Sequence, residues 1–209
     1  YFDVNTELTK KLFHEFLNAD IRDFIYFSSV KATADTVDGF LYEDHLSNPQ
    51  TPYGKSKLAA EKFLISQKLP ENKRLFIIRP SMIHGPGNKG NLNLLYKFVD
   101  KGIPYPLAAF ENKRSFLSID NLNFLILEMI KNKDVESGIY NFADDDSLST
   151  NELVKLIAKV SGKKEKLWKI SSGLISSAAK IGDAVKLPLN SERLKKLTEN
   201  YLVSNKKIK

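Results

Sequence analysis

Two short apolar segments, separated by a helix whose start is clearly marked in the sequence, constrain the fold of this chain most strongly. Residues 24–27 and residues 75–78 are continuous apolar runs of strand length. Between them, Thr51 can cap a helix whose first position suits Pro52. A strand, a helix and a strand in this order predict a parallel βαβ unit. In such units ligands bind at the carboxyl ends of the strands.

The rest of the chain alternates between helical and strand patterns and predicts an α/β protein. We expect the following elements: helices at 5–17, 92–99, 121–131, 150–160, 173–185 and 191–199, and strands at 115–119 and 139–142. The pattern is less regular beyond Gly87. The last third therefore predicts a smaller α+β lobe set on the parallel sheet.

Composition excludes several classes of protein. With 209 residues, 42% of them hydrophobic, the chain can form one globular domain or one domain with a lobe. It has no apolar stretch approaching the roughly 20 residues that span a bilayer. It has no cysteine, and its histidines show no metal-ligand spacing, so we expect no metal site. The net charge of +7 is spread along the chain, which indicates a solvated lysine-rich surface rather than a nucleic-acid site.

Tyr53 and Lys57 form the candidate catalytic pair. Residues four apart on a helix project from one face, and an ammonium beside a phenol favours the phenolate. The nearby helix N-terminus acts in the same direction. Ser29, at the end of the preceding strand, could hydrogen-bond the same substrate oxygen. The tyrosine–lysine spacing alone is a weak signal, because a packed tyrosine followed by a surface lysine is the ordinary alternative.

The combination of motifs is more specific than any one of them. Residues 24–29, residues 52–57 and residues 78–80, followed by the turn at residues 85–87, resemble the extended short-chain dehydrogenase family. That family includes UDP-hexose 4-epimerases, nucleotide-sugar 4,6-dehydratases and 4-keto-sugar reductases. The resemblance continues into residues 114–120, which are similar to the family's phosphate-binding strand.

The resemblance implies a partial Rossmann-type, doubly wound parallel sheet with a smaller α+β substrate-binding lobe. Residues 1–86 would be the C-terminal part of the dinucleotide-binding domain. Residues 87–209 would mainly form the nucleotide-sugar-binding lobe, with the chain returning to the sheet around residues 114–142. The family's Gly-x-x-Gly-x-x-Gly turn for the pyrophosphate is absent. We therefore expect the 209-residue chain alone to bind neither NAD nor NADP appreciably and to be inactive.

The resemblance also implies a role for each residue that matches a motif. Tyr53 would be the acid/base, and Lys57 would favour its phenolate and bind the nicotinamide ribose. Ser29 would orient the sugar hydroxyl or keto oxygen. Pro80 and Ser81 would lie against the nicotinamide of NAD or NADP.

Three further residues would bind the substrate. Asn91 and Leu92 match the stretch that meets the sugar diphosphate, and Arg114 would pair with phosphate through its planar guanidinium. An ordinary surface arginine is the alternative for Arg114. The expected partner is a UDP-linked sugar, with no nucleic acid and no membrane, and the resemblance is compatible with a homodimer. We expect a cytoplasmic protein.

The expected activity is that of an NAD(P)-dependent, UDP-hexose 4-epimerase-like enzyme. The family's dehydratases carry Asp-Glu directly after the Ser29 position, whereas Val30 and Lys31 stand there in this chain, which disfavours dehydration. A 4-keto-sugar reductase of the same family is one alternative. A non-catalytic NAD(P)-binding regulatory member is the other, although such a protein has no need of Ser29, Tyr53 and Lys57 together.

Overall fold

The chain divides into two compact units in a computed structural model that describes residues 1–87, 91–185 and 190–209. The first unit comprises Tyr1–Gly85, Ser115–Asp146 and Leu202–Lys209. The second comprises Pro86–Arg114 and Ser147–Tyr201. Each unit has buried apolar side chains of its own, in two clusters in the first unit and one in the second.

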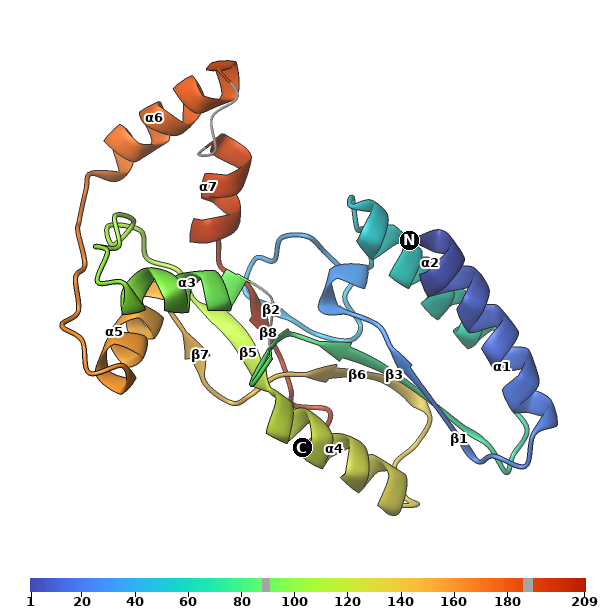
Figure 1. Cartoon of the computed structure of the whole chain (residues 1–209). Helices are drawn as coiled ribbons and strands as arrows, with labels where there is room; N and C mark the ends of the chain where they lie inside the picture. Colours follow the sequence, from blue (N-terminus) through green and yellow to red (C-terminus); the bar gives the residue numbers. More distant parts are fainter. Residues whose placement is uncertain (88–90, 186–189) are drawn as a thin grey trace. The chain divides into compact units, whose positions relative to one another are not determined.

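Figure 1 labels the α-helices and most of the strands of both units. Those of the first are η1 (Asp3–Glu7), α1 (Leu8–Asn18), β1 (Asp23–Phe27), η2 (Val30–Ala32), β2 (Phe40–Leu41), α2 (Pro52–Ser66), β3 (Arg74–Pro80), β4 (Met82–His84), β5 (Arg114–Ser118), α4 (Ile119–Lys131), β6 (Gly138–Phe142) and β8 (Leu202–Val203). Those of the second are α3 (Asn91–Asp100), β7 (Ser147–Leu148), α5 (Thr150–Val160), α6 (Ser172–Val185) and α7 (Ser191–Thr198).

A parallel sheet in the order β1-β3-β6 is the centre of the first unit. Successive side chains of β3 point to opposite faces, so Leu75 and Ile77 join one buried cluster while Phe76 and Ile78 join another. The first cluster packs under α1 and α2, and the second packs under α4 (Figure 1). Apolar residues on both faces explain why β3 is a continuous hydrophobic run. The predicted parallel βαβ unit and the α/β class are confirmed.

Helix α2 begins where the sequence predicts. Thr51 has extended backbone angles, and its hydroxyl accepts a hydrogen bond from the amide of Gly54, while Pro52 occupies the first helical turn. The longer helices elsewhere also follow their predicted ranges within a few residues. Local capping and apolar spacing therefore determine these elements.

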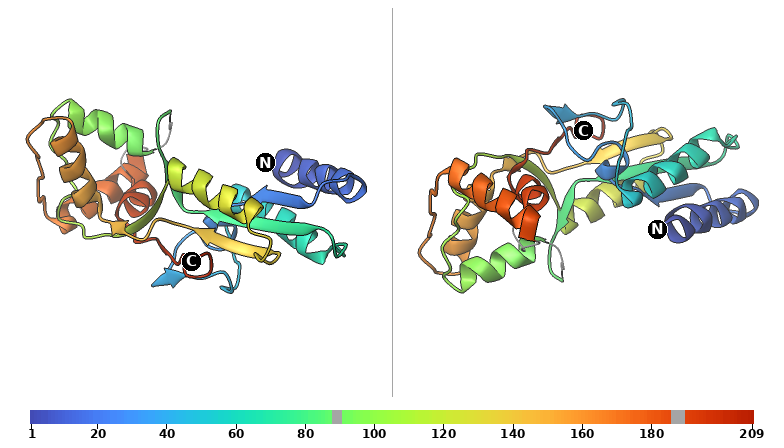
Figure 2. Two further views of the ribbon diagram at one scale, coloured as in Figure 1. Left: turned by 90° about the horizontal axis from the view of Figure 1, so that it is seen from below. Right: turned by 90° about the horizontal axis from the view of Figure 1, so that it is seen from above.

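The shortest strands were not predicted. β2 pairs in parallel with β8, although the two lie far apart in the sequence, and Figure 2 shows the C-terminal segment beside β2. β4 pairs in parallel with β5. A strand of two or three residues has too few positions for an alternating pattern, so only its tertiary partner defines it.

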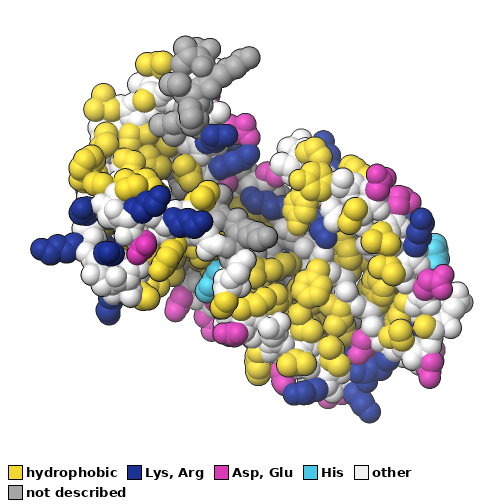
Figure 3. All heavy atoms as spheres, viewed as in Figure 1, with side chains coloured by type: hydrophobic (Ala, Val, Ile, Leu, Met, Phe, Trp, Pro, Cys, Tyr) yellow, Lys and Arg dark blue, Asp and Glu magenta, His cyan; other side chains and the backbone are white. Residues whose placement is uncertain are grey.

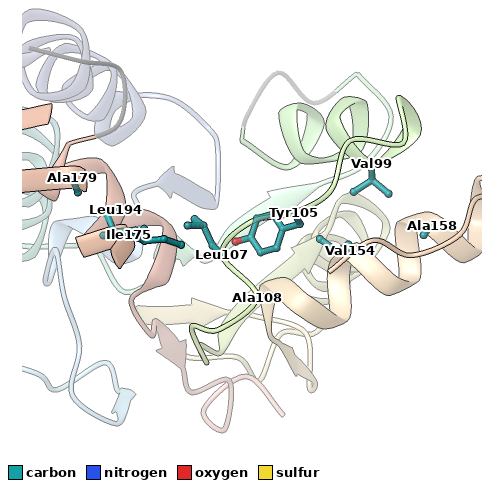
Figure 4. Close-up of a cluster of buried hydrophobic side chains, with 9 residues drawn as sticks. All are labelled: Val99, Tyr105, Leu107, Ala108, Val154, Ala158, Ile175, Ala179 and Leu194. Atoms are coloured by element: carbon teal, nitrogen blue, oxygen red, sulfur yellow. The ribbon is translucent and has the colours of Figure 1, made fainter. Parts of the chain in front are cut away.

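The second unit is built around a cluster of small and medium apolar side chains. Figure 4 shows this cluster, whose members come from α3, α5, α6 and α7 and from the irregular segment between α3 and β5: Val99, Tyr105, Leu107, Ala108, Val154, Ala158, Ile175, Ala179 and Leu194 lie in it. α5 begins with a capping box formed by Ser149 and Glu152. The amide of Tyr105 donates a hydrogen bond to the carbonyl of Lys166, and the carbonyl of Tyr105 accepts one from the amide of Trp168, which fixes the irregular segment against the stretch before α6.

Candidate functional site

The predicted catalytic residues all lie in the first unit, around the carboxyl ends of its parallel strands. Ser29 follows β1, Pro80 ends β3, and Tyr53 and Lys57 lie in the first two turns of α2. Tyr53 and Lys57 are partly exposed, as expected for groups that must reach a ligand. The predicted positions of these residues on a strand end and a helix start are confirmed, whereas their catalytic roles stay predictions.

Lys57 links α2 to the end of β1. Its ammonium donates a hydrogen bond of 2.7 Å to the carbonyl of Phe27, and it lies 5.0 Å from the centre of the Tyr26 ring. Burial lowers the pKa of Lys57, and the negative charge of Glu61 acts in the opposite direction. An ammonium has three donors and the carbonyl uses one, so Lys57 can be held at the strand end and still bind a ligand.

The segment after Ser29 packs tightly against the start of α2. Ser29 caps η2 by accepting a hydrogen bond from the amide of Lys31, whose ammonium donates to the carbonyl of Asp35. The carboxylate of Asp35 in turn accepts a hydrogen bond of 2.6 Å from the amide of Gln50. These contacts fix the position of Ser29 relative to the helix that carries Tyr53.

A cluster that the sequence did not predict connects the same three elements. The carboxylate of Glu61, on α2, pairs with the guanidinium of Arg79, on β3, at 3.0 Å (Oε1 to Nε) and 2.6 Å (Oε2 to Nη2). The hydroxyl of Ser28, which directly follows β1, donates a hydrogen bond to Oε1 of Glu61. The spacing of Tyr53, Lys57 and Glu61, each four residues apart, places Glu61 on the same helical face as the candidate pair, but this spacing does not indicate Arg79 or Ser28 as its partners.

Ser81 is the predicted cofactor-binding residue with the most informative surroundings. Ser81 is 9% exposed, and its hydroxyl has no hydrogen-bond partner within the described ranges. Buried hydroxyls are usually bonded, because an unpaired one costs about 1–3 kcal/mol. The oxygen next to the end of β3 is thus suited to bond a polar group of a ligand.

The predicted substrate-binding residues belong to the second unit. Asn91 begins α3, but its side chain lies outside the described part of the chain, and Leu92 is partly exposed in the same helix. Arg114 donates hydrogen bonds to the carbonyls of Lys196 and Glu199 at the end of α7, the latter at 3.2 Å. Burial lowers the pKa of Arg114, and nearby Glu199 opposes this shift. Arg114 is not an ordinary surface arginine, and its phosphate-binding role stays a prediction.

No group of three or more potential metal-ligand side chains is found within residues 1–87, 91–185 and 190–209. Every helix in those ranges is too short or too polar to cross a bilayer. On the face shown in Figure 3, lysine and arginine side chains are interspersed with hydrophobic and acidic ones.

The fold and the site together define a class of protein. Doubly wound domains with a parallel sheet bind their ligands at the carboxyl ends of the strands, and this chain has a hydroxyl, a phenol and an ammonium in that region. A match to the NAD dependent epimerase/dehydratase family covers residues 1–143 of this chain. The chain belongs to that family.

Individual relatives agree with this assignment. The chain is 36% identical over 162 residues to UDP-glucose 4-epimerase from Vibrio cholerae, a match that covers 76% of this chain and 49% of the relative. It is 31% identical over 172 residues to N-acetyl-alpha-D-glucosaminyl-diphospho-ditrans,octacis-undecaprenol 4-epimerase from Escherichia coli O157:H7, covering 78% of this chain and 50% of that protein. The chain spans about half the length of these curated relatives.

A solved structure shows the same fold. UDP-glucose 4-epimerase from Thermus thermophilus, in complex with NAD, superposes with a TM-score of 0.68 at 17% sequence identity. The superposition covers 99% of this chain and 63% of that one. The predicted Rossmann-type sheet is therefore confirmed at the level of the fold.

Proposed function

We propose that the protein containing this chain is an NAD(P)-dependent nucleotide-sugar 4-epimerase acting on a UDP-linked hexose. The observation that supports this most directly is the hydrogen bond from Lys57 to the carbonyl of Phe27, because it joins the helix of Tyr53 to the strand end that carries Ser29. The named relatives support the choice of a 4-epimerase over other members of the family.

In the proposed mechanism Tyr53 moves the proton of the sugar hydroxyl. Its phenolate takes the proton from the 4-hydroxyl as carbon 4 is oxidised and returns it when the 4-keto group is reduced. Lys57 stabilises the phenolate by its positive charge, and Ser29 donates a hydrogen bond that orients the same oxygen. The bound nicotinamide would supply hydride acceptance and return at carbon 4.

The residues present fit the nicotinamide end of such a cofactor. The unpaired hydroxyl of Ser81 offers a buried polar contact beside the end of β3, and Lys57 has donors beyond the one used by Phe27. The choice between NAD and NADP rests on the ribose contacts of a glycine-rich turn, a motif that this sequence does not contain.

Product analysis of the full-length protein tests the proposed reaction. With NAD and UDP-hexoses or UDP-N-acetylhexosamines, NMR should show interconversion of 4-epimers and no 4-keto-6-deoxy sugar. Elimination needs a carboxylate base beside the hexose, whereas Val30 is apolar and buried and the ammonium of Lys31 is bonded to the carbonyl of Asp35. Accumulation of a 4-keto-6-deoxy product would contradict the proposal. Consumption of a supplied 4-keto sugar with NAD(P)H, without epimerisation, would favour the reductase.

Arg114→Ala should weaken UDP binding to the full-length protein by roughly 1.5–3 kcal/mol, the usual contribution of a charge-assisted hydrogen bond. Isothermal titration with UDP measures this effect. Because Arg114 also bonds the end of α7, thermal unfolding is followed in parallel. Lys113→Ala, at the exposed neighbouring side chain, is the matched control and should leave the UDP dissociation constant unchanged. Wild-type UDP affinity in a folded Arg114→Ala variant would restrict Arg114 to a structural role.

A further inference from the structure

A buried ionic cluster lies directly behind the candidate catalytic residues. Glu61, Arg79 and Ser28 are 1%, 3% and 4% exposed, so the cluster is almost fully removed from water. The two bonds between Glu61 and Arg79 form a paired contact between planar groups, which fixes orientation as well as distance. The bond from Ser28 adds a third element to the same carboxylate.

Each member of the cluster is next to a residue of the candidate site. Ser28 precedes Ser29, and Arg79 precedes Pro80 and Ser81 in the sequence. Glu61 lies one helical turn beyond Lys57, on the same helix as Tyr53. The cluster therefore connects the three pieces of chain that must keep a fixed geometry for proton transfer.

Stability alone does not account for such a cluster. Replacing a buried ion pair by apolar residues of similar volume is often neutral or even stabilising, because removing two charges from water costs several kcal/mol. The hydrogen bonds of the cluster also have a defined geometry, because the carboxylate of Glu61 accepts them from the ends of two different strands. Catalytic geometry is sensitive to this kind of restraint, since a misplacement of about 1 Å can cost roughly 100-fold in rate.

We propose that Glu61, Arg79 and Ser28 are positioning residues whose buried contacts hold Tyr53 and Lys57 in register with Ser29 and with the end of β3. The inference rests on the proposed function, because it assumes that Tyr53 is the acid/base. It adds three residues that touch neither the proposed substrate nor the cofactor.

The same two strands provide a matched control at their opposite ends. Asp23, which begins β1, pairs with Arg74, which begins β3, at 2.8 Å (Oδ1 to Nε). Both side chains are only 11–12% exposed, so this is another largely buried ion pair between acidic and basic side chains. It lies at the amino ends of the strands, remote from the candidate site.

The experiment compares Ser28→Ala, Glu61→Gln, Asp23→Asn and Tyr53→Phe in the full-length protein. Thermal unfolding is measured for each variant, and kcat and KM are determined below the onset of unfolding. We expect Ser28→Ala and Glu61→Gln to lower kcat about 10-fold to 100-fold while KM for the nucleotide sugar changes less than about twofold. Asp23→Asn should lower thermal stability but keep the wild-type kcat.

The four variants distinguish a failure of this inference from a failure of the proposed function. Wild-type kcat in folded Ser28→Ala and Glu61→Gln would overturn the inference, while a large loss in Tyr53→Phe would leave the proposed function intact. An equal loss of kcat in Asp23→Asn would also overturn it, since general loosening of the sheet would then explain the effect. If Glu61→Gln does not fold, Ser28→Ala decides, because it retains the ion pair. Full turnover in Tyr53→Phe would refute the proposed function, and the inference with it.

Discussion

In the full-length protein, Tyr53→Phe is expected to lower kcat by about 100-fold or more, the usual effect of removing a positioned acid/base. The phenol oxygen is the only group lost, so the ring keeps its edge contact with Tyr1, whose centroid lies 5.7 Å away. The protein should therefore fold normally and bind the nucleotide sugar with nearly unchanged affinity. Steady-state kinetics, with a separate binding titration, measures both effects.

Tyr42→Phe is the matched control for this prediction. Tyr42 is 40% exposed and directly follows β2, so its hydroxyl can be removed without affecting the candidate site. Its kcat should equal that of the wild type. If Tyr53→Phe also turned over at the wild-type rate, another group would have to carry the proton, and the proposed role of Tyr53 would be wrong.

Sequence reasoning was most successful where local chemistry determines structure. The start of α2 is encoded within a few residues, because Thr51 supplies the cap and Pro52 has the backbone angle of a first turn. The apolar run that became β3 is equally local, since a strand buried on both faces needs no alternation. Together with the apolar run at residues 24–27, these two elements predict the parallel βαβ unit and the strand ends where Ser29 and Pro80 lie.

The ionic cluster could not be predicted in the same way. A glutamate within a lysine-rich helix ordinarily indicates a solvated face, and an arginine at the end of a strand ordinarily reaches water. Glu61 and Arg79 are buried only because β1, α2 and β3 converge on one carboxylate, which is a tertiary property. The bonds from Arg114 to the end of α7 have the same origin, because they join residues more than 80 positions apart.

The helix that carries Tyr53 also depends on a residue without a side chain. Gly54→Ala is expected to destabilise the protein by about 1–3 kcal/mol, the usual cost of overpacking. A Cβ at this position would overlap the carbonyl oxygen of Lys31 and approach Cβ of Pro49 to 2.8 Å. Alanine is otherwise favoured over glycine inside a helix by about 1 kcal/mol, so steric overlap decides the sign. Chemical denaturation measures the loss.

Gly173→Ala is the control that separates the steric effect from helix propensity. Gly173 lies in α6, and an added Cβ there would meet nothing closer than the Ser171 hydroxyl at 3.7 Å. The control should therefore be neutral or slightly stabilising. The ammonium of Lys31 is hydrogen-bonded to the carbonyl of Asp35, so the steric overlap at position 54 should move the start of α2 rather than the segment around Lys31. Since α2 carries Tyr53, kcat should fall together with stability. A Gly54→Ala variant as stable and active as Gly173→Ala would show that the segment around Lys31 yields instead, and that close packing against it does not fix Tyr53.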